Sequence, residues 1–205
     1  MAAAEATPAA PRSAMLRTRT ALLLAAPVLA ALAIRAFALE PFEVASESML
    51  PTLEAGDRLF VNKLALPKRG DVVVFEHASA RFVKRIVALP GERVAVRGGR
   101  VFVNGFAAEE WPTGTLRLDD AGRPLAGLRE QIGGVEHARL ADRGAPRADF
   151  EALVPEAHYF VLGDNRDHSS DSRYLGAIAR DEIIGTVTTL LGHGPRFERA
   201  GADAE

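Results

Sequence analysis

The 205-residue sequence contains no cysteine, a single tryptophan and no large excess of either charge. Without cysteine there are neither disulfides nor thiolate metal ligands. The 25 Lys and Arg against 27 Asp and Glu give a net charge of -2, so the chain lacks the basic balance typical of nucleic-acid binding and we expect no nucleic-acid partner. The five histidines are scattered and none has a partner at metal-binding spacing, so we expect no metal and no cofactor.

Long apolar runs are equally scarce, with one exception near the N-terminus. Residues 20–39 read TALLLAAPVLAALAIRAFAL, which as a helix measures roughly 30 Å and crosses a hydrocarbon core. Only Arg35 interrupts the run, one turn from its end, where a long side chain reaches the interface. Three arginines precede it: Arg12, Arg17 and Arg19. The positive-inside rule therefore predicts a single-pass anchor with its N-terminus in the cytoplasm and everything after it outside.

An alternative reading of this run is a cleaved signal peptide. Ala36-Phe37-Ala38 has the small-x-small pattern of a cleavage site, but Arg35 just before it and the length of the run favour an anchor. Both readings export the remainder of the chain. Residues 1–19 and 193–205 lack large apolar side chains at regular spacing, which predicts a disordered cytoplasmic tail and a disordered C-terminal tail.

After residue 39 the sequence predicts an all-β body, which we place at residues 40–192. Short β-branched runs bounded by Gly, Pro and Asp recur, with no long stretch at helical spacing. Gly98-Gly99 predicts a tight hairpin, because glycine supplies the positive φ angles of a type I′ turn. Residues 107–155 are polar and Gly/Arg-rich, which predicts an inserted, hairpin-rich subdomain. The predicted strands are Arg58–Leu64, Val72–Glu76, Arg81–Val87, Arg93–Val96, Arg100–Val103, His158–Leu162 and Ile184–Leu190.

Two segments carry candidate catalytic side chains. The segment 46–53, SESMLPTL, offers serine hydroxyls, although by itself it is also typical of a turn or a helix start with Ser48 as cap. In FVKRIV, residues two apart share a strand face, so Lys84 projects with Phe82 and Ile86. Lys84 is either an edge-strand lysine that reaches water or a desolvated amine, and only burial would lower its pKa far enough for it to act as a base.

A third segment, 163–174, reads GDNRDHSSDSRY and is by default a solvated loop held by Asp/Arg pairs. A calcium site is disfavoured, because Arg166 stands where an oxygen ligand is needed and no EF-hand Gly or terminal Glu follows. A triad with His168 as base is a further alternative, but no Gly-x-Ser-x-Gly elbow surrounds any serine.

Taken in order, the apolar run, SESMLPTL, RGDVVVFEHASARFVKRIVALPGE, VFVNG and GDNRDHSSDSRYLGAI resemble the motifs of bacterial type I signal peptidases, also called leader peptidases. The resemblance covers the chain from about residue 39 to about residue 190. One departure is Glu47, which stands where glycine is frequent in the family. The resemblance implies serine endopeptidase activity by a Ser/Lys dyad, removing signal peptides after Ala-x-Ala sites.

The resemblance also assigns roles to individual residues. It implies that Ser48 is the nucleophile and Lys84 the general base, that the Ser46 hydroxyl joins the Ser48 N–H at the oxyanion, and that the Ser169 hydroxyl orients Lys84. Supporting roles fall to Asp171 and Arg173, expected as an ion pair that shapes the loop, and to Asp164 and Arg166. Apolar residues around Val44, Leu50 and Phe82 are expected to line pockets for small side chains.

The implied fold is a coiled, barrel-like body of antiparallel β-sheet on the extracytoplasmic side of the bacterial inner membrane. The expected partners are preproteins with signal peptides and membrane lipid, and the expected state is a monomer. Two alternatives stay open. One is a specialised relative that matures a single pilin or conjugation substrate, and the other is a non-catalytic, membrane-tethered β-rich binding module.

Overall fold

The computed structural model describes residues 25–27, 38–119, 122–142, 144 and 148–191. The predicted tails at 1–19 and 193–205 lie outside these residues, as does most of the predicted anchor at 20–39. Within the described ranges, no helix combines the length and hydropathy needed to span a bilayer. The described residues from Glu40 onward belong to one compact unit.

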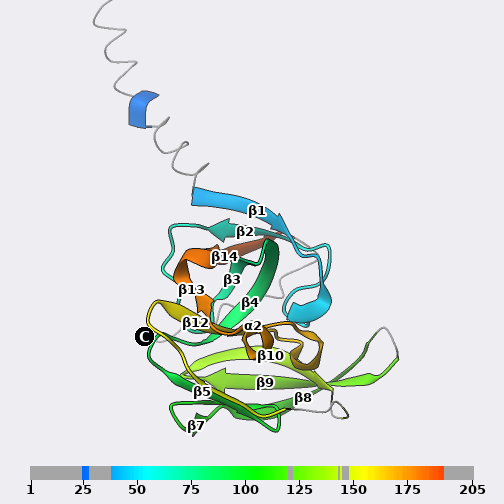
Figure 1. The fold of residues 1–205 in the computed structure, drawn as a ribbon. Helices are drawn as coiled ribbons and strands as arrows, with labels where there is room; N and C mark the ends of the chain where they lie inside the picture. Colours follow the sequence, from blue (N-terminus) through cyan, green and yellow to red (C-terminus); the bar gives the residue numbers. More distant parts are fainter. Residues whose placement is uncertain (1–24, 28–37, 120–121, 143, 145–147, 192–205) are drawn as a thin grey trace, which may run out of the picture. The chain divides into compact units, whose positions relative to one another are not determined.

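This unit consists mainly of antiparallel β-sheet, so the all-β prediction is confirmed. The largest sheet has seven strands in the order β1-β2-β14-β3-β4-β12-β13 (Figure 1). The seven strands predicted from the sequence, five of them in this sheet, are all present, and their bounds differ from the prediction by two residues at most. The strands of this sheet are β1 (Leu39–Glu43), β2 (Arg58–Asn62), β3 (Val72–His77), β4 (Ala80–Ala88), β12 (His158–Leu162), β13 (Ile178–Ala179) and β14 (Ile183–Leu191).

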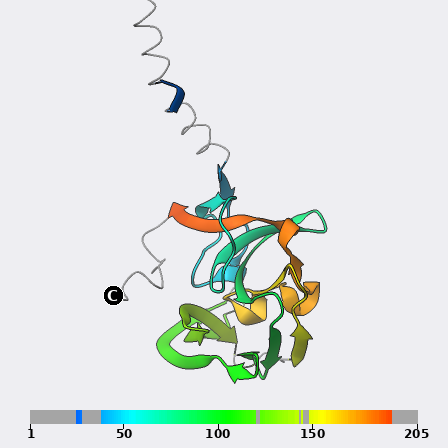
Figure 2. The same ribbon diagram turned by 90° about the vertical axis from the view of Figure 1, so that its left-hand side faces the viewer.

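Two smaller sheets complete the body. One has the order β11-β5-β6-β7 and the other β10-β9-β8, and both lie below the large sheet in the two views of Figures 1 and 2. The predicted turn at Gly98-Gly99 joins β5 to β6 with φ angles of 56° and 84°, as a type I′ turn requires. The strands are β5 (Arg93–Arg97), β6 (Arg100–Val103), β7 (Phe106–Ala107), β8 (Glu109–Leu118), β9 (Pro124–Ile132), β10 (Val135–Asp142) and β11 (Phe150–Leu153).

The predicted insertion at 107–155 is divided between these two sheets. Strands β8, β9 and β10 form the three-stranded sheet by themselves, in sequential hairpins. Strand β11 leaves that sheet and pairs with β5. The stretch 109–142 is therefore the part of the insertion that folds as a sheet of its own.

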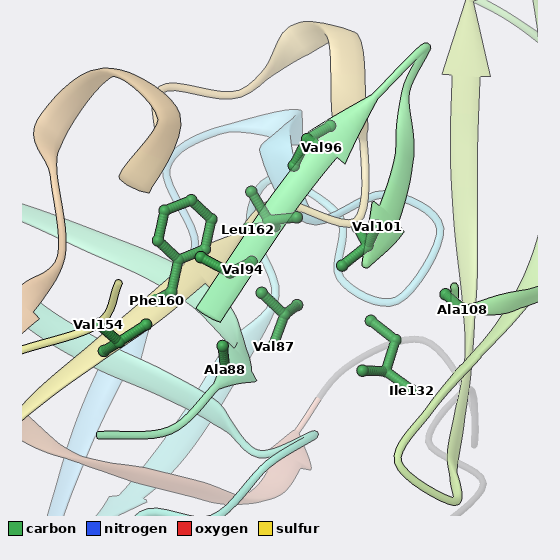
Figure 3. Close-up of a cluster of buried hydrophobic side chains, with 10 residues drawn as sticks. All are labelled: Val87, Ala88, Val94, Val96, Val101, Ala108, Ile132, Val154, Phe160 and Leu162. Atoms are coloured by element: carbon green, nitrogen blue, oxygen red, sulfur yellow. The ribbon is translucent and has the colours of Figure 1, made fainter. Parts of the chain in front are cut away.

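The apolar core lies in several clusters rather than one. One cluster packs the small sheets against β4 and β12, with Phe160 and Leu162 facing Val94 and Val101, and Ala108 and Ile132 beside them (Figure 3). Two more clusters pack against the large sheet, one around Met49 and one that includes Phe75. Short helices fill the remaining connections: η1 (Glu47–Met49), η2 (Arg166–His168), α2 (Ser172–Leu175) and η3 (Arg180–Glu182).

Candidate functional site

Ser48 lies in the short 3-10 helix η1, which follows β1 after a three-residue connection, 44–46. Its neighbour Met49 is fully buried in the core of the large sheet and anchors the turn. The residue at the N-cap is Ser46, whose side chain makes no capping hydrogen bond. The alternative in which Ser48 serves as the cap is therefore wrong, and both hydroxyls remain available for other contacts.

Lys84 lies in β4, which is paired with β3 on one side and β12 on the other. It is an interior strand, and Lys84 is only 3% exposed, so the alternative of an edge-strand lysine in water is wrong. The Lys84 Nζ lies 2.7 Å from Ser48 Oγ and donates to the Val83 carbonyl oxygen at 2.8 Å. The ammonium also lies 5.8 Å from the centre of the Phe82 ring, on the face predicted from strand alternation.

Burial lowers the pKa of Lys84 from 10.5 to about 8, and it does so against the opposing charges of Asp171 and Asp164, which favour the ammonium. The shift changes the population of the neutral amine at pH 7 from about one molecule in 3,000 to about one in ten. Because a lysine acts as a base only when neutral, this buried position makes proton acceptance from Ser48 feasible near neutral pH.

The two groups expected at the oxyanion, the Ser46 hydroxyl and the Ser48 N–H, both lie at the start of η1. The Ser46 Oγ lies 3.2 Å from Ser48 Oγ. The Ser48 N–H belongs to the first turn of η1, where backbone N–H groups have no acceptor within the helix. An oxyanion bound between such donors is stabilised by roughly 2.7 to 4 kcal/mol for each of them.

The loop 163–173 packs against the turn that carries Ser48. Its buried Asp171 caps the helix α2, accepts from the Gly163 N–H at 3.0 Å, and pairs with Arg173 at 2.8 and 2.9 Å. The expected Asp171–Arg173 ion pair is therefore present. Aspartate is favoured at an N-cap because its carboxylate accepts from the free N–H groups of the first turn.

Ser169 does not make the hydrogen bond expected of it. Its Oγ is buried and has no hydrogen-bond partner in the described part of the chain, so the expected contact with Lys84 is absent. The side chain packs on Gly163 instead. A Cβ at position 163 would lie 2.5 Å from the Ser169 Cβ and 2.6 Å from the Ser48 carbonyl oxygen, which explains the glycine. Ser169 and the Ser48 carbonyl oxygen thus both pack closely on Gly163.

Asp164 and Arg166 do not pair with each other or with Asp171. Arg85 holds Asp164 by two parallel hydrogen bonds, Nε to Oδ1 at 2.9 Å and Nη2 to Oδ2 at 2.7 Å, and the Thr52 hydroxyl donates to the same carboxylate. Burial opposes ionisation of Asp164, but Arg85, His137 and the Thr52 hydroxyl together outweigh it and lower the pKa of the carboxyl. The pair ties β4, next to Lys84, to the loop and to the segment after Ser48.

Sequence reasoning missed Arg85, Thr52, Asn165 and Glu130. Asn165 donates its backbone N–H to the Ser48 carbonyl at 3.0 Å and its side-chain amide to the Glu47 carbonyl at 3.2 Å. A signal existed for Arg85, since a charged residue inside an otherwise apolar run requires a partner. No comparable signal marks Glu130, which lies in the stretch where strand alternation is weak.

The remaining expected residues are His168 and the apolar residues Val44, Leu50 and Phe82. His168 Nε2 is 3.7 Å from an Asp119 carboxylate oxygen and makes no hydrogen bond to a serine among the described residues. Val44 and Leu50 are 3% and 2% exposed and pack in two apolar clusters. Phe82 is half-buried and stacks on Phe75 with ring centres 5.4 Å apart.

Comparisons with known proteins identify the family of the chain. A family model described as "Signal peptidase, peptidase S26" matches residues 17–191. Signal peptidase I of Pseudomonas fluorescens is 35% identical over 210 residues, covering 83% of this chain and 73% of that protein. Signal peptidase I T of Bacillus subtilis strain 168 is 39% identical over 166 residues, covering 78% of this chain and 77% of that protein.

Among solved structures, a signal peptidase I from Enterococcus faecalis V583 is 28% identical, with a TM-score of 0.41, and the match covers 60% of this chain and 98% of that one. The family assignment depends on the sequence matches, which extend over most of the chain. The chain belongs to the peptidase S26 family of signal peptidases.

Proposed function

We propose that this protein is a membrane-anchored serine endopeptidase that removes signal peptides from exported preproteins, with Ser48 as nucleophile and Lys84 as general base. The observation that carries the proposal is the 2.7 Å contact between Lys84 Nζ and Ser48 Oγ on a side chain that is only 3% exposed. A non-catalytic binding module has no need for a lysine desolvated against a serine hydroxyl, and its burial costs folding free energy.

The reaction proceeds through proton transfers to and from one amine, that of Lys84. Neutral Lys84 accepts the proton of Ser48 as Oγ attacks the scissile carbonyl, and the oxyanion forms between the Ser48 N–H and the Ser46 hydroxyl. The resulting ammonium gives its proton to the leaving amine, which departs as the mature protein's new N-terminus. Lys84 then removes a proton from the water that attacks the acyl-enzyme, and it returns that proton to Ser48 Oγ as the C–O bond breaks and the signal peptide leaves with its new carboxylate.

The proposal includes the location of the enzyme and the nature of its substrates. Residues 20–39 would anchor a barrel-like catalytic body on the extracytoplasmic face of the inner membrane, in contact with lipid and as a monomer. Preproteins whose own apolar segments lie in that membrane reach a high effective concentration at the site, which is only nine residues beyond residue 39. Small-x-small sequences such as Ala-x-Ala are the proposed cleavage sites.

A cleavage assay tests the proposal. The full chain, purified in detergent, is incubated with a preprotein that carries an Ala-x-Ala site, alongside Ser48→Ala and Lys84→Ala. We expect cleavage by the unmodified chain and loss of cleavage in both variants, with near-UV circular dichroism unchanged. Cleavage that persists in either folded variant would remove that residue from the mechanism, and an inert unmodified chain would favour the binding module.

A further inference from the structure

The three-stranded sheet β8–β10 is bonded directly to the segments that carry the proposed catalytic residues. The Leu140 N–H of β10 donates to the Asp164 carbonyl at 2.8 Å, and the Asp142 N–H donates to the Asp167 carboxylate at 2.7 Å. Leu50, two residues after Ser48, packs with Leu125 of β9 and Leu140 of β10. The sheet therefore supports both the Ser48 turn and the loop 163–173.

Glu130 of β9 makes the strongest of these connections. Its carboxylate is 0% exposed and binds Arg166 with both oxygens, Nη1 to Oε1 at 2.8 Å and Nη2 to Oε2. Burial opposes ionisation of Glu130, but Arg166 and then His137 outweigh it and hold the pKa well below its usual range. Glu130 is thus a buried anion that fixes the guanidinium of a buried arginine in one orientation.

The surroundings of this pair are also ionic. Along one row of the sheet, Glu110 lies opposite Glu130, which lies opposite His137. Arg139 reaches Glu110 at 2.6 Å and Glu130 at 3.3 Å, and His137 Nε2 lies 3.1 Å from Glu130 Oε2. Buried ion pairs cost desolvation free energy and add little net stability compared with apolar packing, so stability alone is a poor explanation for this cluster.

From Arg166 a short path of contacts reaches the Ser48 turn. Arg166 Nε donates to the Gly163 carbonyl at 3.2 Å, and the Arg166 carbonyl accepts from Arg173. The next residue back, Asn165, is the one that holds the carbonyls of Glu47 and Ser48. A displacement of Arg166 would move Asn165, and with it the backbone of the proposed nucleophile.

We propose that Glu130 is a positioning residue for the cleavage reaction: by holding Arg166, the three-stranded sheet sets the place of Asn165 and hence the place of Ser48 relative to Lys84. This inference depends on the proposed function. It assigns the part of the chain at 109–142 a role in turnover rather than in substrate recognition.

The test measures kcat and KM separately for the full chain in detergent, with the Ala-x-Ala preprotein as substrate. For Glu130→Gln we expect kcat to fall about ten- to a hundredfold with KM within about twofold, because small displacements of reacting groups reduce turnover without altering the binding surface. The double variant Glu130→Gln/Arg166→Gln should lose no more than the more impaired single variant, since Glu130 acts through Arg166 and both changes break the contact between them.

Two controls separate positioning from general instability. Glu136→Gln removes a carboxylate that pairs with Arg129 on the same sheet and should leave kcat unchanged. Ile132→Ala weakens the sheet's apolar packing in a different cluster and should lower the melting temperature while kcat is kept. If Glu130→Gln fails to fold, Glu130→Asp is measured in its place, because it keeps the negative charge but has a side chain too short to hold Arg166 in the same position.

The outcomes are distinguishable. Unchanged kcat in folded Glu130→Gln or Glu130→Asp overturns the positioning role while an active unmodified enzyme leaves the proposed function standing. The positioning role is also overturned if the loss of kcat in the double variant equals the product of the losses in the two single variants. Such a result would show that Glu130 and Arg166 act through separate contacts. A chain that cuts nothing before any substitution overturns the proposed function, and this inference with it.

Discussion

Replacing the buried lysine should make the protein more stable near neutral pH at the same time as it removes activity. The pKa of Lys84 falls from 10.5 to about 8 because burial disfavours the ammonium. The unfolded chain therefore binds this proton more tightly than the folded chain, and folding at pH 7 costs about 3 kcal/mol through this one group. Lys84→Met keeps a similar apolar stem and removes that cost. It also removes the hydrogen bonds to Ser48 and Val83, each worth about 1 kcal/mol.

The pH dependence of stability separates the cost of burying the ammonium from the gain of its hydrogen bonds. Only the first depends on the difference in the pKa of Lys84 between the folded and unfolded chains. Between the folded pKa of about 8 and the unfolded value of 10.5, the unfolded state holds more protons, so the free energy of unfolding of the unmodified chain rises with pH. Relative to Lys84→Met, it should rise by about 2.5 kcal/mol between pH 7 and pH 10.

Urea denaturation of both proteins in detergent at several pH values measures this difference. Lys63→Met is a matched control for the substitution itself, since Lys63 is an exposed lysine whose Nζ is 3.0 Å from Glu40. Parallel profiles for Lys84→Met and the unmodified chain would refute the reasoning, because they would show that Lys84 titrates alike in the folded and unfolded states.

Three further predictions concern the surroundings of the site. Ser46→Ala should lower kcat by about 10²- to 10³-fold with KM little changed, as expected for loss of an oxyanion donor, and an unchanged kcat in steady-state assays would remove Ser46 from that role. Gly163→Ala should cost about 1 to 3 kcal/mol in urea denaturation and impair cleavage, because its Cβ would lie 2.6 Å from the Ser48 carbonyl oxygen; wild-type stability would contradict this packing. Burial and the nearby Arg85 lower the pKa of His137, so below about pH 6.5 the unfolded chain takes up a proton that the folded chain does not. The unmodified chain should therefore lose stability between about pH 7 and pH 5 faster than His137→Gln, and equal losses would exclude His137 as a source of acid sensitivity.

The large sheet could be predicted from sequence because its strands follow the expected patterns. Val72, Val73 and Val74 form a continuous buried run in β3, as expected for a strand covered on both faces. The hairpin at Gly98-Gly99 could be predicted from residue type alone, since both turn positions need a positive φ angle, which glycine adopts readily. The proximity of Ser48 and Lys84, 36 residues apart, was implied by the family resemblance and has no counterpart in local periodicity.

The strands β8 to β10 could not be predicted, because ionic residues replace apolar ones on their inward face. Glu130 in β9 and both His137 and Arg139 in β10 are buried at positions where alternation would call for leucine or valine. In β8, Pro112 and Gly114 further weaken the strand signal. The pairing partners that make such residues tolerable, such as Arg166 for Glu130, lie 36 residues away and are invisible to a local pattern.

The most direct test of the account is the pH dependence of kcat/KM for preprotein cleavage by the unmodified chain in detergent, because it reports the ionisation of the free enzyme. The account predicts a rise with one midpoint near the pKa of about 8 set by the burial of Lys84, and a plateau above it. A profile that is flat from about pH 6 to pH 9, or one whose midpoint lies near 6.5 where an ordinary histidine titrates, would contradict the claim that the neutral amine of Lys84 activates Ser48.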